Sequence, residues 1–199
     1  MSKGTILLRL TSVRVISCFI VSAAIMFSSA VVSAQCELAA KLFLKQPNKR
    51  TYIGLLDMAG GHVREDCKSI LLKPDVNDSL LRIVETGNPW AIKVLVDGLH
   101  SLDGGDLEDA HRALGISAEE NPKIILRLYV EKRISSVGLS SSMQMLPESL
   151  VDNTQGRIER LAQRSKIISA IKEPDLREAR DIALAALKDR IVDERAILK

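Results

Sequence analysis

Two Asn-Pro pairs, Asn88-Pro89 and Asn121-Pro122, constrain the fold of this chain more narrowly than any other feature. In each pair, an asparagine that can cap a helix precedes a proline at the first helical position, where the missing N–H removes no hydrogen bond. Apolar residues cover most of the circumference of the helix expected after each pair, so both helices should be largely buried. The sequence therefore predicts a core built from helices.

The remaining composition also favours helices. Aromatic residues make up only 3% of the chain, and no run alternates in the manner of a β-strand, so we expect no sheet. Further helices are expected at 36–46, 49–58, 62–72, 78–86 and 106–114. Asp78 and Asp106 are the expected N-caps of the last two helices, and Gly87 and Gly115 are their expected stops.

Residues 135–152 interrupt this pattern, because they are rich in serine and include a proline. We expect a linker here, with a weak helical turn. Two amphipathic helices follow at 154–171 and 174–198, in the arrangement of an antiparallel hairpin. The predicted organisation is a leader at 1–34, a helical repeat-like region at 35–134, a linker at 135–152 and a C-terminal helical hairpin at 153–199.

The two Asn-Pro pairs lie 33 residues apart, a spacing typical of paired-helix repeats. Over about 50 residues the chain resembles the tetratricopeptide and HEAT-like repeat proteins. A tetratricopeptide hairpin has small residues at two positions, an apolar residue at a third and a proline at a fourth. The residues at these positions here are Gly98, Ala110, Leu114 and Pro122, respectively. The chain departs from that family at Val94, where it prefers Trp, and at Ser101, where it prefers Tyr. The resemblance implies stacked helical hairpins, as a solenoid-like array or an irregular bundle.

The first 34 residues have the pattern of a secretory signal peptide. A basic start precedes an uncharged run at 15–32, and Val32-Ser33-Ala34 supplies the small residues at the two recognised positions of a cleavage site. We expect cleavage before Gln35 and a periplasmic or secreted protein. The uncharged run approaches the length of a membrane span, so an uncleaved anchor is the alternative, and only then would the protein contact a membrane.

Removal of the leader abolishes the excess of basic residues. The chain has 28 Lys and Arg against 25 Asp and Glu, and Lys3, Arg9 and Arg14 belong to the leader, so 25 of each sign remain. We therefore expect no nucleic-acid partner, since such binding requires a basic surplus. Residues 73–130 carry ten acidic and six basic residues, so this region and the C-terminal hairpin should attract each other.

Two cysteines, Cys36 and Cys67, remain once Cys18 has left with the leader. An even pair in an oxidising compartment predicts one disulfide bond. The alternative is a pair of buried free thiols.

The densest polar cluster includes His100, Asp103, Asp106 and His111. These side chains are of the types that bind divalent cations, but their spacing matches neither a calcium loop nor a zinc-binding histidine pair. A helix–helix turn at Asp103 and an N-cap at Asp106 explain the two aspartates better. We therefore predict no metal site and no cofactor. No motif of a known catalytic site is present, and we predict no catalytic residues.

Two groups of residues are candidates for contact with a partner protein. The first group is apolar and comprises Met143, Met145 and Leu146, and the second is basic and comprises Arg157, Arg160 and Arg164. The arginines share one flank of a predicted helix, where they would meet an acidic partner or form a solvated face. The apolar residues lie in the Ser-rich segment, where they would contact a partner or fill the junction between the two halves.

These features predict an exported, non-enzymatic module that binds proteins, because stacked helical hairpins present extended concave surfaces. A more specific hypothesis, by analogy alone, is an immunity protein against a cell-wall-degrading toxin. The alternative is an envelope-acting enzyme, or its accessory subunit, that uses acidic residues near 100–111.

Overall fold

The computed structural model describes residues 33–57, 59 and 61–198. Within these residues every regular element is a helix, and the only extended pairing is an isolated bridge between Leu56 and Val63. The predicted all-α fold is confirmed. The expected leader lies outside the described residues, except for Ser33 and Ala34. Among the described helices, none combines the length and apolarity needed to cross a membrane.

A helix at 33–45 comes first. The elements after it are α2 (Lys49–Ile53), α3 (Glu65–Leu71), α4 (Pro74–Glu85), α5 (Pro89–Gly98), η1 (Leu99–Ser101), α6 (Gly104–Glu120), α7 (Pro122–Val130), α8 (Ser136–Gln144), η2 (Glu148–Leu150), α9 (Thr154–Ser169), η3 (Pro174–Leu176) and α10 (Arg177–Ile197).

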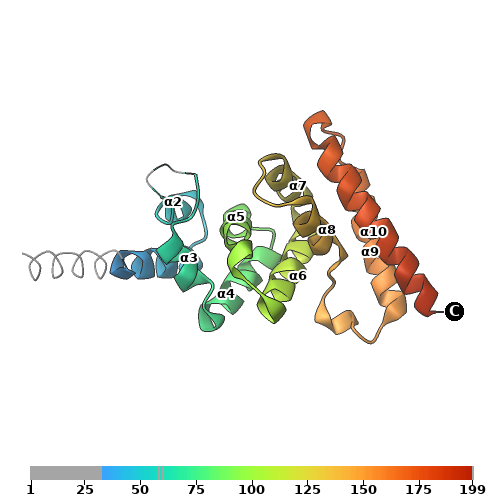
Figure 1. The fold of residues 1–199 in the computed structure, drawn as a ribbon, viewed down its shortest axis with the longest axis horizontal. Coiled ribbons are helices and arrows are strands. Elements are labelled where there is room, and N and C mark those ends of the chain that lie inside the picture. The colour runs from blue at the N-terminus through green and yellow to red at the C-terminus, as the bar shows by residue number, and fades with distance from the viewer. Residues whose placement is uncertain (1–32, 58, 60, 199) are drawn as a thin grey trace, which may run out of the picture.

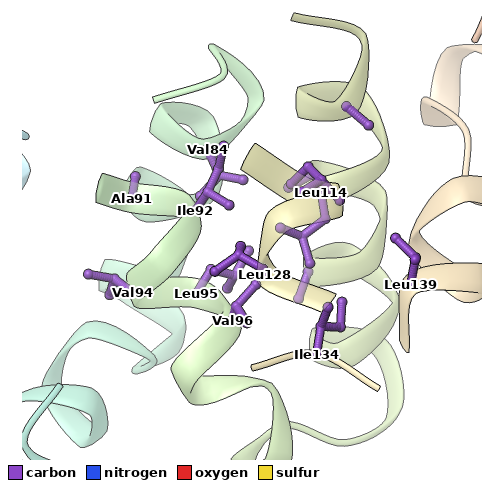
Figure 2. Close-up of a cluster of buried hydrophobic side chains, with 14 of the residues drawn as sticks. Val84, Ala91, Ile92, Val94, Leu95, Val96, Leu114, Leu128, Ile134 and Leu139 are labelled. Atoms are coloured by element: carbon purple, nitrogen blue, oxygen red, sulfur yellow. The ribbon is translucent and has the colours of Figure 1, made fainter. Parts of the chain in front are cut away.

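The helices form two neighbouring rows (Figure 1). In one row α3, α4, α6, α8 and α10 each pack against the next, and in the other α2 contacts α5, which contacts α7. Helix α9 pairs with α10 at the C-terminal end, as the predicted hairpin requires. One apolar core runs from Cys36 to Leu187, and Figure 2 shows its middle part, where Leu95 and Leu128 lie together. The N-terminal region and the C-terminal hairpin therefore share a core.

Three asparagines at N-cap positions connect the helix starts of the second row to one another. Asn48, Asn88 and Asn121 occupy the N-cap positions of α2, α5 and α7. The side-chain amide of Asn88 donates to the carbonyl of Pro47 (3.0 Å), and that of Asn121 donates to the carbonyl of Gly87 (3.2 Å). Each of these two amides therefore binds the carbonyl of the residue that directly precedes the N-cap asparagine of the previous helix in the row. We call these three residues the asparagine ladder.

The starts of α5 and α7 agree with the sequence prediction, although the two caps differ. Asn88 Oδ1 accepts hydrogen bonds from the backbone N–H groups of Trp90 and Ala91, whereas the side chain of Asn121 makes no such bond. Helix α4 begins at Pro74 rather than at Asp78, because proline suits the first turn of a helix as well as it ends the preceding one. The predicted helices at 49–58 and 62–72 are both too long.

Gly115 lies inside α6, where we expected it to end a helix, and Asp106 lies in the first turn rather than at the N-cap. A methyl group on Gly115 would lie 2.4 Å from the carbonyl oxygen of Ser142 and 2.9 Å from that of Met145. Glycine at this position therefore permits the close approach of α8 to α6. By contrast, Gly87 follows α4 with φ +74°, in the left-handed conformation of a helix stop.

Replacement of Gly115 by alanine should destabilise the fold by about 1–3 kcal/mol, the usual cost of overpacking, since the added methyl group meets backbone atoms that cannot rotate away. The matched control is Gly105→Ala in the same helix, where an added methyl group has no neighbour within 4 Å. Urea denaturation should show a loss for the first variant and no loss for the second. Equal stabilities would contradict the proposed close approach.

The segment at 135–152 is not a linker, because it contains the nine-residue helix α8. Ser135 caps this helix by accepting a hydrogen bond from Gly138 N–H (3.1 Å). Leu139 and Met143 are fully buried, and α8 packs against both α6 and α10. Serine composition was misleading because Ser142 bonds to the carbonyl of Gly138 within its own helix and can therefore be buried.

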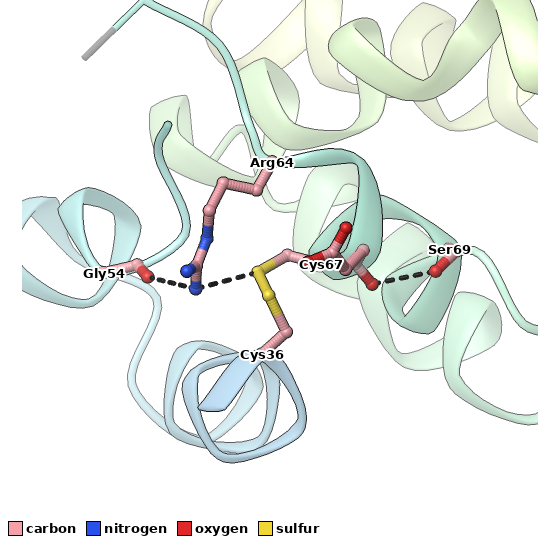
Figure 3. Close-up of a disulfide and its surroundings, with 6 residues drawn as sticks. Cys36, Gly54, Arg64, Cys67 and Ser69 are labelled. Atoms are coloured by element: carbon pink, nitrogen blue, oxygen red, sulfur yellow. Dashed lines mark hydrogen bonds between the residues drawn. A yellow bond between two sulfur atoms is a disulfide. The ribbon is translucent and has the colours of Figure 1, made fainter. Parts of the chain in front are cut away.

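Cys36 and Cys67 form the predicted disulfide, with their Cα atoms 4.9 Å apart (Figure 3). Both cysteines are fully buried, and the bond joins the helix at 33–45 to α3. Arg64 Nη2 lies 3.3 Å from Cys67 Sγ and donates to the carbonyl of Gly54. The disulfide therefore lies beneath a side chain that connects α3 to the end of α2.

Candidate binding site

The arginine row of α9 points into the molecule rather than to a solvated flank. Arg164 has no exposed surface, and its Nε and Nη2 donate to Glu119 Oε1 on α6 at 3.0 and 2.8 Å. Its Nη1 donates to the carbonyls of Met143 and Met145 at 2.6 and 2.7 Å. Arg160 also pairs with Glu119. The prediction that Arg164 contacts a partner is wrong, because the side chain is fully buried and all three guanidinium nitrogens donate within the fold.

Two further arginines bind the irregular backbone that follows α8. Arg157 Nη1 donates to the carbonyls of Leu150 (3.1 Å) and Val151, while its Nε donates to Glu194 (2.8 Å). Arg112 Nε donates to the carbonyl of Leu146 (3.2 Å). Carbonyls at and beyond the end of a helix have no helical N–H group as a partner. The segment 143–151 obtains donors from guanidinium groups of α6 and α9.

A pocket of about 420 Å³ lies beside this segment, between α6, α8, α9 and α10. Its apolar wall is formed by Met145, Leu146, Pro147 and Val151. Its basic wall is formed by Arg112, Arg157 and Arg190. We call it the arginine pocket.

Arg190 is the least constrained of these three arginines. Its side chain is 44% exposed, and its Nη2 lies 2.8 Å from Glu194 Oε1 without the alignment of a hydrogen bond. The carboxylate of Glu194 is buried and also pairs with Arg157. Arg157 and Arg190 therefore share one carboxylate, whereas Arg112 pairs with Asp109 and Glu148, so Arg190 is the pocket arginine with a guanidinium group available to a ligand.

The structure divides the predicted partner-contact residues into two sets. Met143 and Arg164 are buried, so Met143 fills the junction between α6 and α10 and the contact prediction is wrong for it. Met145, Leu146 and Arg157 line the arginine pocket, whereas Arg160 belongs to neither set, because its half-exposed side chain pairs with Glu119 outside that pocket. Arg112 and Arg190 come from helices distant in sequence, and no local pattern marked them as members of the same site.

The candidate metal ligands do not converge. His100 and His111 line a pocket between α5, α6 and α8, whereas Asp103 and Asp106 line a different pocket beside α3. Within the described part of the chain, no group of three or more His, Cys, Asp or Glu side chains is arranged to hold a metal ion.

His111 is buried at the interface of α6 and α8. Its Nδ1 lies 2.9 Å from Ser142 Oγ, and that hydroxyl donates its proton to the carbonyl of Gly138. Nδ1 must therefore be the donor to Ser142, which fixes the tautomer of the neutral imidazole. Burial lowers the pKa of His111 below its ordinary value, because the charged form loses hydration.

The free energy of unfolding should fall as the pH is lowered through about 6.5, the ordinary histidine pKa. The unfolded chain binds a proton there, while folded His111 resists protonation down to its lower pKa, so its stabilising contribution is complete above that range and is lost below it. Denaturation at pH 7.5 and 5.0 should show a smaller pH effect for His111→Gln. The control His100→Gln removes an exposed imidazole and should retain the wild-type pH effect.

We call the pocket that His100 and His111 line the histidine pocket, and a second buried ion pair lies beside it. The side chain of Asp97 on α5 accepts from Arg133 Nε (3.0 Å) and from the backbone N–H of Val63 (3.0 Å). Arg133 Nη2 also lies 3.4 Å from the hydroxyl of Tyr52. Burial acts against the Arg133 cation, but hydrogen bonds to Asp97 and Tyr52 outweigh it and raise the pKa. This cluster connects α2, α5 and the segment after α7.

The fold and the pocket define an all-helical protein with one internal disulfide and an arginine-lined recess near its C-terminal hairpin. No family model, no curated protein and no solved structure matches the chain.

Proposed function

We propose that this chain is an exported, non-enzymatic protein-binding module whose arginine pocket receives an acidic segment of its partner. The observation that carries the proposal is the convergence of three guanidinium groups from three helices beside an apolar wall. Arginine is the side chain best suited to bind carboxylates, and it is enriched among residues that dominate interface energetics. An acidic residue next to an apolar one would complement both walls.

Export is supported by the leader pattern together with the buried disulfide, since such bonds persist in oxidising compartments. A protein partner outside the cytoplasm is the corresponding expectation, and immunity to a cell-wall-degrading toxin is its more specific form. The envelope-enzyme alternative receives less support, because Asp103 and Asp106 line a different pocket from His111 and are exposed. N-terminal sequencing of the exported protein tests cleavage before Gln35.

The binding proposal is tested by affinity capture from an envelope extract, with mass spectrometry of the retained proteins. Arg190→Gln removes a pocket charge, while Arg177→Gln removes an exposed charge from the same helix, outside the pocket. Loss of a charge-assisted hydrogen bond should weaken capture by about 10-fold or more in the first variant. Wild type and Arg177→Gln should retain the same partner. Equal recovery by Arg190→Gln would contradict the role of the arginine pocket.

A further inference from the structure

The histidine pocket between α5, α6 and α8 is a second site, separate from the arginine pocket. Its volume is about 380 Å³. Apolar side chains dominate its wall, including Leu99, Leu107, Ile134 and Val137. His111 contributes a polar group to this apolar surface. The pocket therefore combines a large hydrophobic contact area with one defined hydrogen-bonding position, the usual composition of a small-molecule or anchor-residue site.

The hydrogen bonds of α8 determine what His111 can offer to a ligand. Because Ser142 Oγ donates to Gly138 and accepts from His111 Nδ1, the imidazole proton resides on Nδ1. The lone pair then lies on Nε2, which has no hydrogen-bond partner among the residues that the structure describes and is not one of their fully buried unpaired atoms, so a ligand can reach it. A ring whose second nitrogen is fixed in this way is a preorganised acceptor. It matches a ligand that donates a hydrogen bond.

The charged side chains around the pocket favour an uncharged ligand. Arg133 lies in the wall, but its cation is paired with buried Asp97. His100, in η1 directly after α5, is exposed, and α8 carries no ionisable side chain. A cationic ligand would find no free carboxylate here, because Asp97 is already paired with Arg133, and the lone pairs of a carboxylate would face the lone pair of Nε2. The complementary molecule is uncharged, apolar over most of its surface, and carries one hydroxyl group.

We propose that the histidine pocket binds a phenolic group, with His111 Nε2 accepting the hydrogen bond from the phenol O–H. A phenol joins a flat apolar body to a hydroxyl that is more acidic than that of an aliphatic alcohol, and it is therefore the stronger donor. Two sources share this chemistry: a tyrosine side chain of a protein and a free phenolic molecule. The inference goes beyond the proposed function and does not depend on the arginine pocket.

The primary test uses the wild-type exported protein and two probes of the same shape, p-cresol and toluene. Each is titrated at pH 7.5 while the ring nitrogens of His111 are followed by NMR. One neutral hydrogen bond should make p-cresol bind about 2- to 10-fold tighter than toluene, despite its greater solubility in water. Only p-cresol should move the Nε2 signal. The proposal is overturned if toluene binds as tightly, or if p-cresol leaves the His111 signals unchanged up to its solubility limit.

Two variants locate the site without disturbing the core. Val137 is 73% exposed and lines the pocket, so Val137→Lys should place a charged chain beside it and reduce p-cresol binding at least several-fold. Val192 is similarly exposed on α10 and does not line the pocket, so Val192→Lys should bind like wild type. Equal binding by both variants would overturn the assignment. Binding of N-acetyl-tyrosinamide would assign the phenol to a protein side chain, and its failure alongside p-cresol binding would assign it to a small molecule.

Discussion

Substitution of Arg164 by methionine should lower the free energy of unfolding by about 3–5 kcal/mol, the usual cost of breaking a buried ion pair. Methionine preserves much of the side-chain length but donates no hydrogen bond. Buried Glu119 would then depend on Arg160 alone, and the carbonyls of Met143 and Met145 would lose their donor. Urea denaturation of purified protein measures the effect.

Two comparisons make this prediction specific. Lys166→Met removes an exposed charge from the same helix and should change stability little. The double variant Arg164→Met with Glu119→Leu removes both members of the pair, so it should recover part of the lost stability. If the single Arg164 variant unfolds at the same denaturant concentration as wild type, the cluster contributes nothing measurable to stability.

Removal of the disulfide, by Cys36→Ala with Cys67→Ala, should cost about 3–4 kcal/mol in the chain-entropy model, because the bond spans a sequence separation of 31 residues. The helix at 33–45 should nevertheless stay docked below the melting transition, since Ala40 and Phe43 bury apolar surface.

Thermal denaturation with and without a thiol reductant provides the measurement for this second prediction. Reductant should lower the melting temperature of the wild type towards that of the double alanine variant and should not alter the variant itself. A wild-type melting temperature that is insensitive to complete reduction, verified by thiol labelling, would contradict the stabilising role of the bond.

The features that the sequence predicted correctly depend on short-range chemistry or on strong periodicity. Proline at the first helical position marked α5 and α7, and apolar spacing marked the buried residues Leu161, Ile168 and Leu187 of the C-terminal hairpin. The disulfide followed from the even number of cysteines. In each case the physical cause lies within the local segment or in a count of residues.

The features that the sequence did not reveal depend on partners far along the chain. Arg164 is buried because Glu119, 45 residues away, and two carbonyls together occupy its guanidinium group. Gly115 is required by the carbonyls of α8, which no helix rule within α6 anticipates. The members of the arginine pocket likewise come from four helices, and only their packing brings them together.

The predicted attraction between residues 73–130 and the C-terminal hairpin has a mixed outcome. Glu119 meets Arg160 and Arg164 in the expected sense. In two other pairs the region 73–130 supplies the base and the C-terminal hairpin supplies the acid: Lys123 pairs with Glu173, and Arg127 pairs with Asp175. Net charge therefore predicted the contact between the regions but not the sign of each pair.

The asparagine ladder fixes where each helix of the second row begins, whatever the number of residues between successive asparagines. Asn48 and Asn88 are 40 residues apart, and Asn88 and Asn121 are 33 apart. The amides of Asn88 and Asn121 nevertheless bind equivalent carbonyls, each directly before the previous asparagine. A search for a fixed repeat period passes over Asn48 for this reason. Residues inserted between two such asparagines would lengthen a loop without shifting the helices beyond it. A fold of this kind can vary the loops along its edge while keeping the arrangement of its helices.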